Sequence, residues 1–108
     1  MSWTLKVKHT RPNTGVNFYK DSSGGGKYMS PSAKTHVKNT YVDTGKRISF
    51  TTSLSGNQLE LTKTYVFSNE TAKNEYVNDS VIQSWLSDRN TYNTANGISK
   101  VILQNEAT

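Results

Sequence analysis

Residues 48–67, which read ISFTTSLSGNQLELTKTYVF, decide the fold that the sequence predicts. Apolar and polar side chains alternate in two runs, the pattern of half-buried strands. The apolar positions are Ile48, Phe50 and Leu54 in the first run, and Leu59, Leu61, Tyr65 and Phe67 in the second. The turn sequence Ser55-Gly56-Asn57 separates the runs, so we expect an antiparallel hairpin with strands over 48–54 and 59–67.

Lys63 falls on the apolar face of the second strand of this hairpin. A charged side chain there predicts either an edge position in the sheet or the mouth of a cavity, because an unpaired buried charge is costly.

Two further strands flank the hairpin at the ends of the chain. The alternation of Trp3, Leu5, Val7 and His9 with polar residues predicts an N-terminal strand with one apolar face. Residues 98–103 are apolar on both faces, which predicts a central strand. Residues 105–108 are expected to form a tail.

The segment after the hairpin predicts a helix over residues 70–87. Ser68 or Asn69 can cap it, and Glu70 suits the first turn, where the helix dipole favours an acidic side chain. The stripe that should face the sheet contains Val81, Ile82, Trp85 and Leu86. Residues 88–95 are expected to form a second helical piece.

Residues 30–44 fit two structures. Ser30 as N-cap, Pro31 in the first turn and Gly45 as C-terminal cap favour a helix, whereas the β-branched content over 36–42 favours a strand. The helix gives an α+β fold, a ferredoxin-like βαββαβ single domain over 1–108 with both helices on one face of an antiparallel sheet. The strand gives a β-meander with one packed helix.

Composition excludes several classes of protein. The 108 residues contain no cysteine and no long apolar run, which excludes a membrane-spanning helix, a disulfide scaffold, a thiolate metal site and a cysteine nucleophile. Residues 1–20 lack the apolar stretch of a secretory signal peptide, so secretion through such a signal is not expected.

Positive charge is concentrated in the first half of the chain. Residues 1–47 hold nine basic and two acidic side chains, whereas the net charge of the whole chain is +5. The candidate basic surface consists of Lys6, Lys8, Arg11, Lys20, Lys27, Lys34 and Lys38. Such a surface fits nucleic acid, an acidic protein or simple solvation; nucleic acid is not favoured, because few of these residues are Arg.

No catalytic constellation is visible in the sequence. His9 and His36 could each serve as a general base or a metal ligand, or simply be a partly buried and a solvated histidine. Glu75 and Asp79 are spaced as neighbours on a helix, and we expect them on its solvated face. The sequence therefore predicts no catalytic residue, no metal site and no cofactor.

Several segments resemble small uncharacterised proteins of marine tailed phages. The segments that carry the resemblance are Trp3–Val7, Thr10–Thr14, Tyr41–Lys46, Leu59–Phe67 and Tyr92–Ile98. The resemblance implies a phage-type origin, with a location in the host cytoplasm or the virion. Its motifs are structural and not catalytic, so it carries over no active site. The segment Val66–Glu70 is also similar to the strand-to-helix passage of dimeric α+β barrel proteins, a likeness at the level of the fold.

These observations lead to an expected function. Six tyrosines, the 38 Ser, Thr and Asn residues and the phage resemblance favour a non-enzymatic, self-associating protein of virion assembly or another protein–protein contact. Val66, Val101 and Leu103 are the candidate interface of a homodimer or larger homo-oligomer. The alternatives are a small-ligand enzyme of the dimeric α+β barrel type, with His9 and aromatic side chains around a pocket, and a basic nucleic-acid-binding module.

Overall fold

Four antiparallel strands form the sheet of the computed structural model, which describes residues 1–18 and 29–108. Their bounds are β1 Trp3–Thr10, β2 Arg47–Leu54, β3 Glu60–Phe67 and β4 Ser99–Ala107, and their order is β2-β3-β1-β4. The predicted hairpin is confirmed, since Phe50 pairs with Tyr65 and Leu54 with Leu61. The predicted N-terminal strand is also confirmed and lies at the centre of the sheet.

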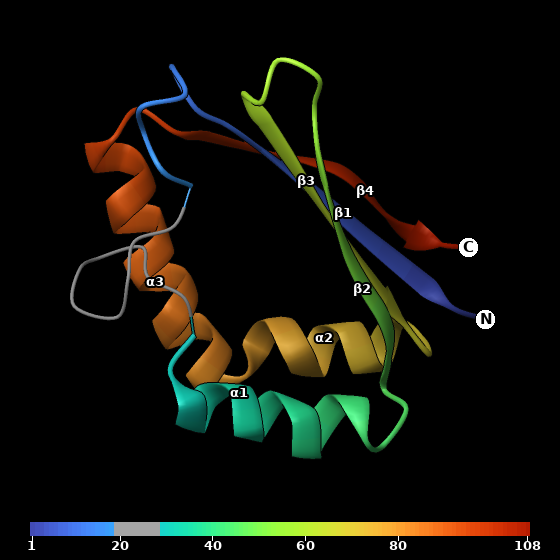
Figure 1. Cartoon of the computed structure of the whole chain (residues 1–108). Coiled ribbons are helices and arrows are strands. Elements are labelled where there is room, and N and C mark those ends of the chain that lie inside the picture. The colour runs from blue at the N-terminus through green and yellow to red at the C-terminus, as the bar shows by residue number, and fades with distance from the viewer. Residues whose placement is uncertain (19–28) are drawn as a thin grey trace.

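Helical segments occupy both crossovers, so the fold is α+β and ferredoxin-like, and the β-meander alternative is wrong. α1 (Pro31–Val37) and the π-helical turn η1 (Lys38–Val42) join β1 to β2. The hydroxyl of Ser30 accepts from the Ala33 amide at the start of α1, and Gly45 has a φ of 75°, which glycine adopts without strain. Figure 1 shows the helices on one side of the sheet.

The predicted helix over 70–87 is wrong in one respect, because the chain bends at Asp79. α2 (Glu70–Asn78) ends there and α3 (Ser80–Ala95) begins, and Asp79 itself has an extended ψ of 129°. The Asp79 carboxylate accepts from the Val81 amide at 2.9 Å and thereby caps α3. α2 and α3 consequently run in different directions, with α2 near one end of the sheet and α3 running toward the other end, where it leads into β4 (Figure 1).

The last strand differs from the sequence-based prediction in two ways. β4 pairs only with β1 and is an edge strand, not a central one, and it includes residues 105–107, which were expected in a tail. The register shifts between Lys6 and Val7, which leaves Leu103 without a directly opposed residue. A register shift of this kind alters which side of the sheet successive side chains face. Apolar residues at consecutive positions of β4 therefore do not mean that both sides of the strand are buried.

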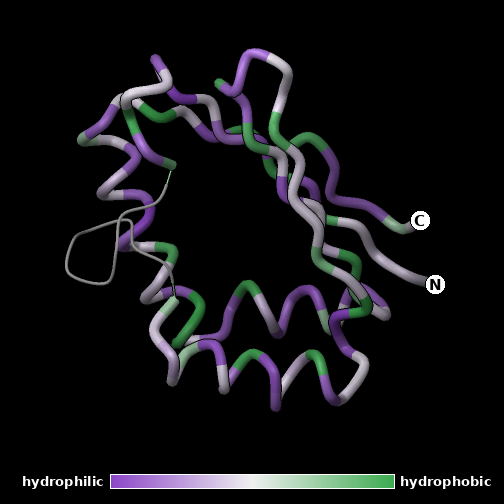
Figure 2. Tube along the Cα trace, in the orientation of Figure 1, coloured by the Kyte–Doolittle hydropathy of each residue, from purple (hydrophilic) through white to green (hydrophobic). Residues whose placement is uncertain are grey.

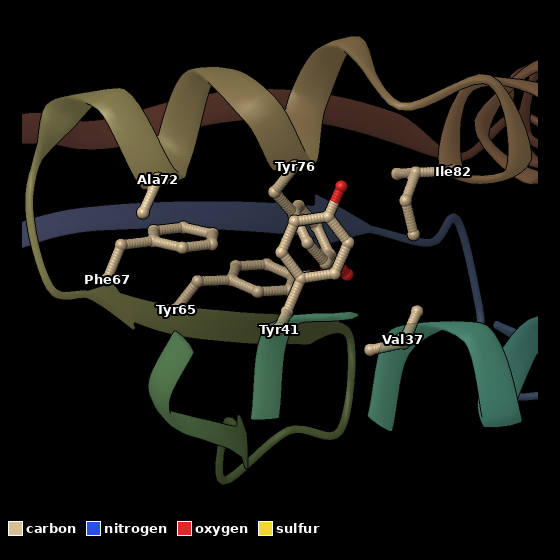
Figure 3. Packing of buried hydrophobic residues seen from close by; sticks show 7 residues of the cluster. All are labelled: Val37, Tyr41, Tyr65, Phe67, Ala72, Tyr76 and Ile82. Carbon is tan, nitrogen blue, oxygen red and sulfur yellow. The ribbon is translucent and has the colours of Figure 1, made fainter. Parts of the chain in front are cut away.

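The core is divided into two clusters. The larger consists of Val37, Tyr41, Tyr65, Phe67, Ala72, Tyr76 and Ile82, and Figure 3 shows its aromatic rings packed between η1, β3 and α2. The smaller consists of Phe18, Tyr92 and Ile98 near the far end of α3. Of the predicted helix stripe, Ile82 is fully buried, whereas Val81, Trp85 and Leu86 are partly buried. Apolar residues are scattered among polar ones along every helix (Figure 2).

Candidate functional site

A cavity of about 320 Å³ lies between the inner face of the sheet and helices α2 and α3. Its apolar wall includes Leu5 and Val7 of β1, Ile82 and Trp85 of α3, and Ile102 of β4. Its polar lining is cationic: Lys63, Lys73, Arg89 and Lys100 all contribute, together with His9. No carboxylate belongs to the lining formed by the residues that the structure describes. We call this space the cationic cavity.

Lys63 reaches the cavity because of its place in β3. It lies opposite Val7 of β1 in the middle of the sheet, and only 3% of its surface is exposed. Its ammonium nitrogen lies 5.3 Å from the centroid of the Trp85 ring, within the range of a cation–π interaction. Of the two positions predicted for Lys63, the sheet edge is wrong; Lys63 does line a cavity, but it is buried in the lining.

Arg89 brings a second buried cation from α3. It is 1% exposed, its Nη1 donates to the carbonyl oxygen of Phe18, and its guanidinium carbon lies 5.9 Å from the Trp85 ring centroid. Lys100 lies opposite His9 on the edge strand and is exposed. With Lys73 of α2, the cations thus come from four separate elements, β3, α3, β4 and α2, and meet at one space.

This crowding changes the protonation of Lys63. Burial, and then the charges of Arg89 and Lys100, lower the pKa of the Lys63 ammonium to about 7. At neutral pH a substantial fraction of Lys63 is therefore the neutral amine, which an ordinary surface lysine is not.

His9 stays neutral under the same influences. It is 5% exposed, and burial followed by the charges of Lys63, Arg89 and Lys100 lowers its pKa to about 3. Its Nδ1 lies 3.5 Å from the side-chain nitrogen of Asn93. An imidazole with so low a pKa is a weak proton acceptor, so the geometry does not favour His9 as a general base. Residues 1–18 and 29–108 contain no cluster of three metal-ligating side chains.

A second cavity, of about 510 Å³, shares a wall with the first. The shared wall is made of Lys63, Tyr65, Tyr76 and Trp85, and the other side is lined by α1, η1 and β2. Lys34, Lys38 and Arg47 lie around this second cavity, so Lys63 has basic side chains on both sides.

The candidate basic surface is divided among different parts of the fold. Lys34 and Lys38 lie on the helical side, while Lys6 and Lys8 alternate with the cavity residues of β1 and lie on the opposite face of the sheet. Arg11 donates to the carbonyl oxygens of Gln58 and Val16. Lys20 and Lys27 lie outside the described residues. The described lysines of this set therefore do not form one continuous face.

Asp79 is the centre of a polar cluster that the sequence analysis expected to be solvated. His36 Nε2 lies 2.7 Å from its Oδ2, and the Tyr41 hydroxyl donates to the same oxygen at 2.5 Å. Burial raises the pKa of the Asp79 carboxyl, but the bonds from Tyr41, from His36 and from backbone amides outweigh this and lower it to about 2. Glu75 does lie at the surface, where it pairs with Lys46 at 2.7 Å. The cluster joins α1 to the start of α3.

The candidate interface residues lie on the sheet. Val66 pairs with Thr4 and Val101 with Lys8, which places both on the face away from the helices. Leu103, at the register shift, is 50% exposed. The rest of this face is mainly Thr, Ser and Lys.

The sequence analysis missed Arg89, although a signal was present. Arg89 follows Ile82 by seven residues and Trp85 by four, so it extends the apolar stripe of the helix. A basic residue on such a stripe, together with Lys63 on an apolar strand face, indicates that two cations point into the same interior.

Comparison with known proteins gives little independent information. No protein-family model and no curated protein sequence matches the chain. Among solved structures, Rv0793 from Mycobacterium tuberculosis is similar, with a TM-score of 0.44 and 10% sequence identity over 98% of this chain and 97% of that one. A likeness at this level carries no argument about function.

Proposed function

We propose that this protein binds a small amphipathic organic anion, a carboxylate with an apolar body, in the cationic cavity. The observation that carries the proposal is the convergence of Lys63, Arg89 and Lys100 on a space with apolar walls. A carboxylate in this space can accept charge-assisted hydrogen bonds from these cations, which are stronger than hydrogen bonds between neutral groups.

The walls favour a ligand with an apolar or aromatic body. Trp85 offers a ring face, and Leu5, Val7 and Ile82 surround it with aliphatic surface. The volume of about 320 Å³ is at the lower end of the ~300–1,000 Å³ usual for small-molecule pockets. A small aromatic carboxylate therefore matches the size, the charge and the walls of the cavity.

We expect calorimetry to detect binding of benzoate at pH 6, and to detect benzamide at least about tenfold more weakly. The two molecules have similar shapes, but a charged hydrogen bond contributes about 1.5–3 kcal/mol. Lys63→Met should reduce benzoate affinity, and Lys6→Met, on the other face of the sheet, should leave it unchanged.

The affinity should also fall as the pH rises through about 7, because Lys63 then loses its positive charge. Equal binding of benzoate and benzamide, or a Lys63→Met variant that binds benzoate like the unaltered protein, would contradict the proposal.

Self-association of a phage-type protein in virion assembly is the second proposal, supported by apolar side chains on an edge strand. Val101 and Leu103 of β4 are about half exposed, and an edge strand has unpaired backbone groups. The occupant we propose is a second copy of this chain, in an interface of about 800 Å² per partner.

Sedimentation is the measurement for this second proposal. At micromolar concentration we expect a dimer, which Leu103→Lys should convert to a monomer and Leu54→Lys, on the opposite edge strand β2, should not. A chain that sediments as a monomer before any substitution would refute it.

None of the helices in the described residues has the length and apolar composition needed to cross a bilayer.

A further inference from the structure

We propose that the second cavity binds a mononucleotide, with its phosphate at the basic side chains of α1, η1 and β2 and its base against Phe50. The cavity of about 510 Å³ lies within the ~300–1,000 Å³ usual for small-molecule pockets. This inference goes beyond the proposed function, because the site uses other cations and takes a ligand of a different class.

An irregularity in β2 turns Arg47 and Phe50 toward this cavity. Arg47 pairs with Phe67, and Phe50 pairs with Tyr65. Three positions along β2 therefore match two along β3, which is the pattern of a β-bulge. Without the extra residue, side chains three positions apart would lie on opposite faces of the sheet. The bulge thus places a cation and an aromatic ring together on the inner face, and both line the second cavity.

Arg47 is held at the cavity by contacts within the fold. Its guanidinium carbon lies 5.3 Å from the centroid of the Phe50 ring, within the range of a cation–π interaction. Burial raises the pKa of the Tyr76 hydroxyl, and the charge of Arg47 and a hydrogen bond from its guanidinium partly offset that rise. A guanidinium has more N–H donors than this one bond uses, so Arg47 can also donate to phosphate oxygens.

Two lysines lie on the helical side of the same cavity. Lys34 and Lys38 are one helical turn apart, and Val37 between them packs into the larger core cluster. All three residues line the cavity, and both lysines are exposed. The Lys38 ammonium lies 2.9 Å from the carboxylate of Asp43, in an exposed ion pair of the kind that contributes little to stability. Lys38 can therefore exchange this partner for a phosphate.

Phe50 supplies the surface for the base. Tyr65, its neighbour on β3, is 8% exposed, whereas Phe50 is 41% exposed although it lies on the inner face. The two ring centroids lie 4.7 Å apart. Nucleobases of any kind stack on exposed aromatic side chains. A ligand with a planar ring and a phosphate therefore matches both the aromatic and the basic part of the lining.

Calorimetry with the full chain at pH 7.5 tests the proposal, with AMP, adenosine and ribose 5-phosphate as the probes. We expect AMP to bind at least about tenfold more tightly than adenosine, which lacks the phosphate and its charged hydrogen bonds. Ribose 5-phosphate lacks the base, so it should bind at least about fivefold more weakly than AMP. Equal binding of AMP and adenosine would overturn the proposal.

Three substitutions assign the site to these residues. Lys34→Gln should reduce AMP affinity at least about fivefold, because it removes a charge at the phosphate. Phe50→Leu keeps an apolar side chain but removes the ring, so it should weaken AMP by a similar factor. Both side chains are exposed, so we expect the fold to be kept, which circular dichroism checks. Lys6→Gln, on the opposite face of the sheet, should leave AMP binding unchanged.

Benzoate binding to the same variant separates this inference from the proposed function. Lys34 belongs to the lining of the second cavity and not to the described lining of the cationic cavity. Lys34→Gln should therefore weaken AMP and leave benzoate affinity unchanged. A variant that binds AMP like the unaltered protein, or that weakens AMP and benzoate equally, would overturn the second site. A tetranucleotide with a 5′ phosphate that binds far more tightly than AMP would overturn the free mononucleotide as the occupant.

Discussion

Lys63→Met is expected to raise the free energy of unfolding by about 2 kcal/mol at pH 6, while it reduces carboxylate binding. Methionine has a similar length and fits the apolar surroundings of Trp85 without a charge. Replacement of a buried ion pair or triad by well-packed apolar residues is often neutral or stabilising by about 1–4 kcal/mol, and we expect the same direction for this buried cation. For a chain of this size the expected rise in Tm is roughly 8 °C.

The pH dependence of this gain follows from the lowered pKa of Lys63. The unfolded chain keeps Lys63 protonated up to its ordinary pKa of 10.5, whereas the folded chain loses that proton near pH 7. Burial of the charged Lys63 therefore lowers the free energy of unfolding by its full amount below pH 7. This loss becomes smaller as the pH rises from about 7 toward 10.5. The advantage of Lys63→Met should be largest at pH 6 and should decrease at pH 9.

Thermal unfolding followed by circular dichroism at pH 6 and pH 9 provides the measurement. Lys6→Met removes the same charge from the other face of the sheet and should change stability by less than about 0.5 kcal/mol. If Lys63→Met lowers the Tm at pH 6, Lys63 stabilises the fold through its contacts, and the argument for a functional cation in this cavity loses its basis.

The strands around Lys63 could be predicted because alternation is a local signal. β1, β2 and β3 each alternate over seven or more residues, and their bounds match within one or two residues.

The break at Asp79 could not be predicted from periodicity, because Val77, Val81 and Ile82 continue an apolar pattern across it. The signal lies instead in Asn78-Asp79-Ser80, three consecutive residues of types that cap helices. The edge position of β4 was missed for a different reason. Apolar residues stand at consecutive positions of β4 next to its register shift, and this pattern predicts a strand that is buried on both faces. The structure instead leaves Val101, Ile102 and Leu103 exposed.

The cationic cavity needed the three-dimensional fold. Lys63 and Arg89 are separated by 26 positions, and their meeting depends on the direction in which α3 leaves Asp79. The sequence indicated that each was unusual, but not that they face one space. His9 was recognised as a candidate. It stays neutral because it is buried and because basic side chains surround it, and both conditions depend on the fold.

Acid should destabilise this protein strongly, and His9 should be the main cause between pH 6.5 and pH 4. In the unfolded chain His9 takes up a proton near its ordinary pKa of 6.5, whereas in the folded chain it does so only near pH 3. The unfolded state therefore binds more protons in this interval, so the free energy of unfolding falls as the pH decreases. Between pH 7 and pH 4 the expected loss from His9 is about 3 kcal/mol. Asp79 adds a smaller loss at lower pH, between 3.8 and about 2, where its bonds to Tyr41 and His36 depend on ionisation.

Urea unfolding of the unaltered protein and of His9→Gln at pH 7 and pH 4 measures the effect. Glutamine cannot take up the proton, so His9→Gln should lose less stability between the two pH values, whatever its stability at pH 7. Lys6→Gln is the control, because Lys6 lies on the opposite face of the sheet from the cavity. NMR of the His9 ring gives a check that needs no variant: its resonances should not titrate between pH 7 and pH 4 in the folded protein. A His9 ring that titrates near pH 6.5 would mean that neither its burial nor the charges of Lys63, Arg89 and Lys100 lower its pKa, and the buried cationic cavity would be refuted at its centre.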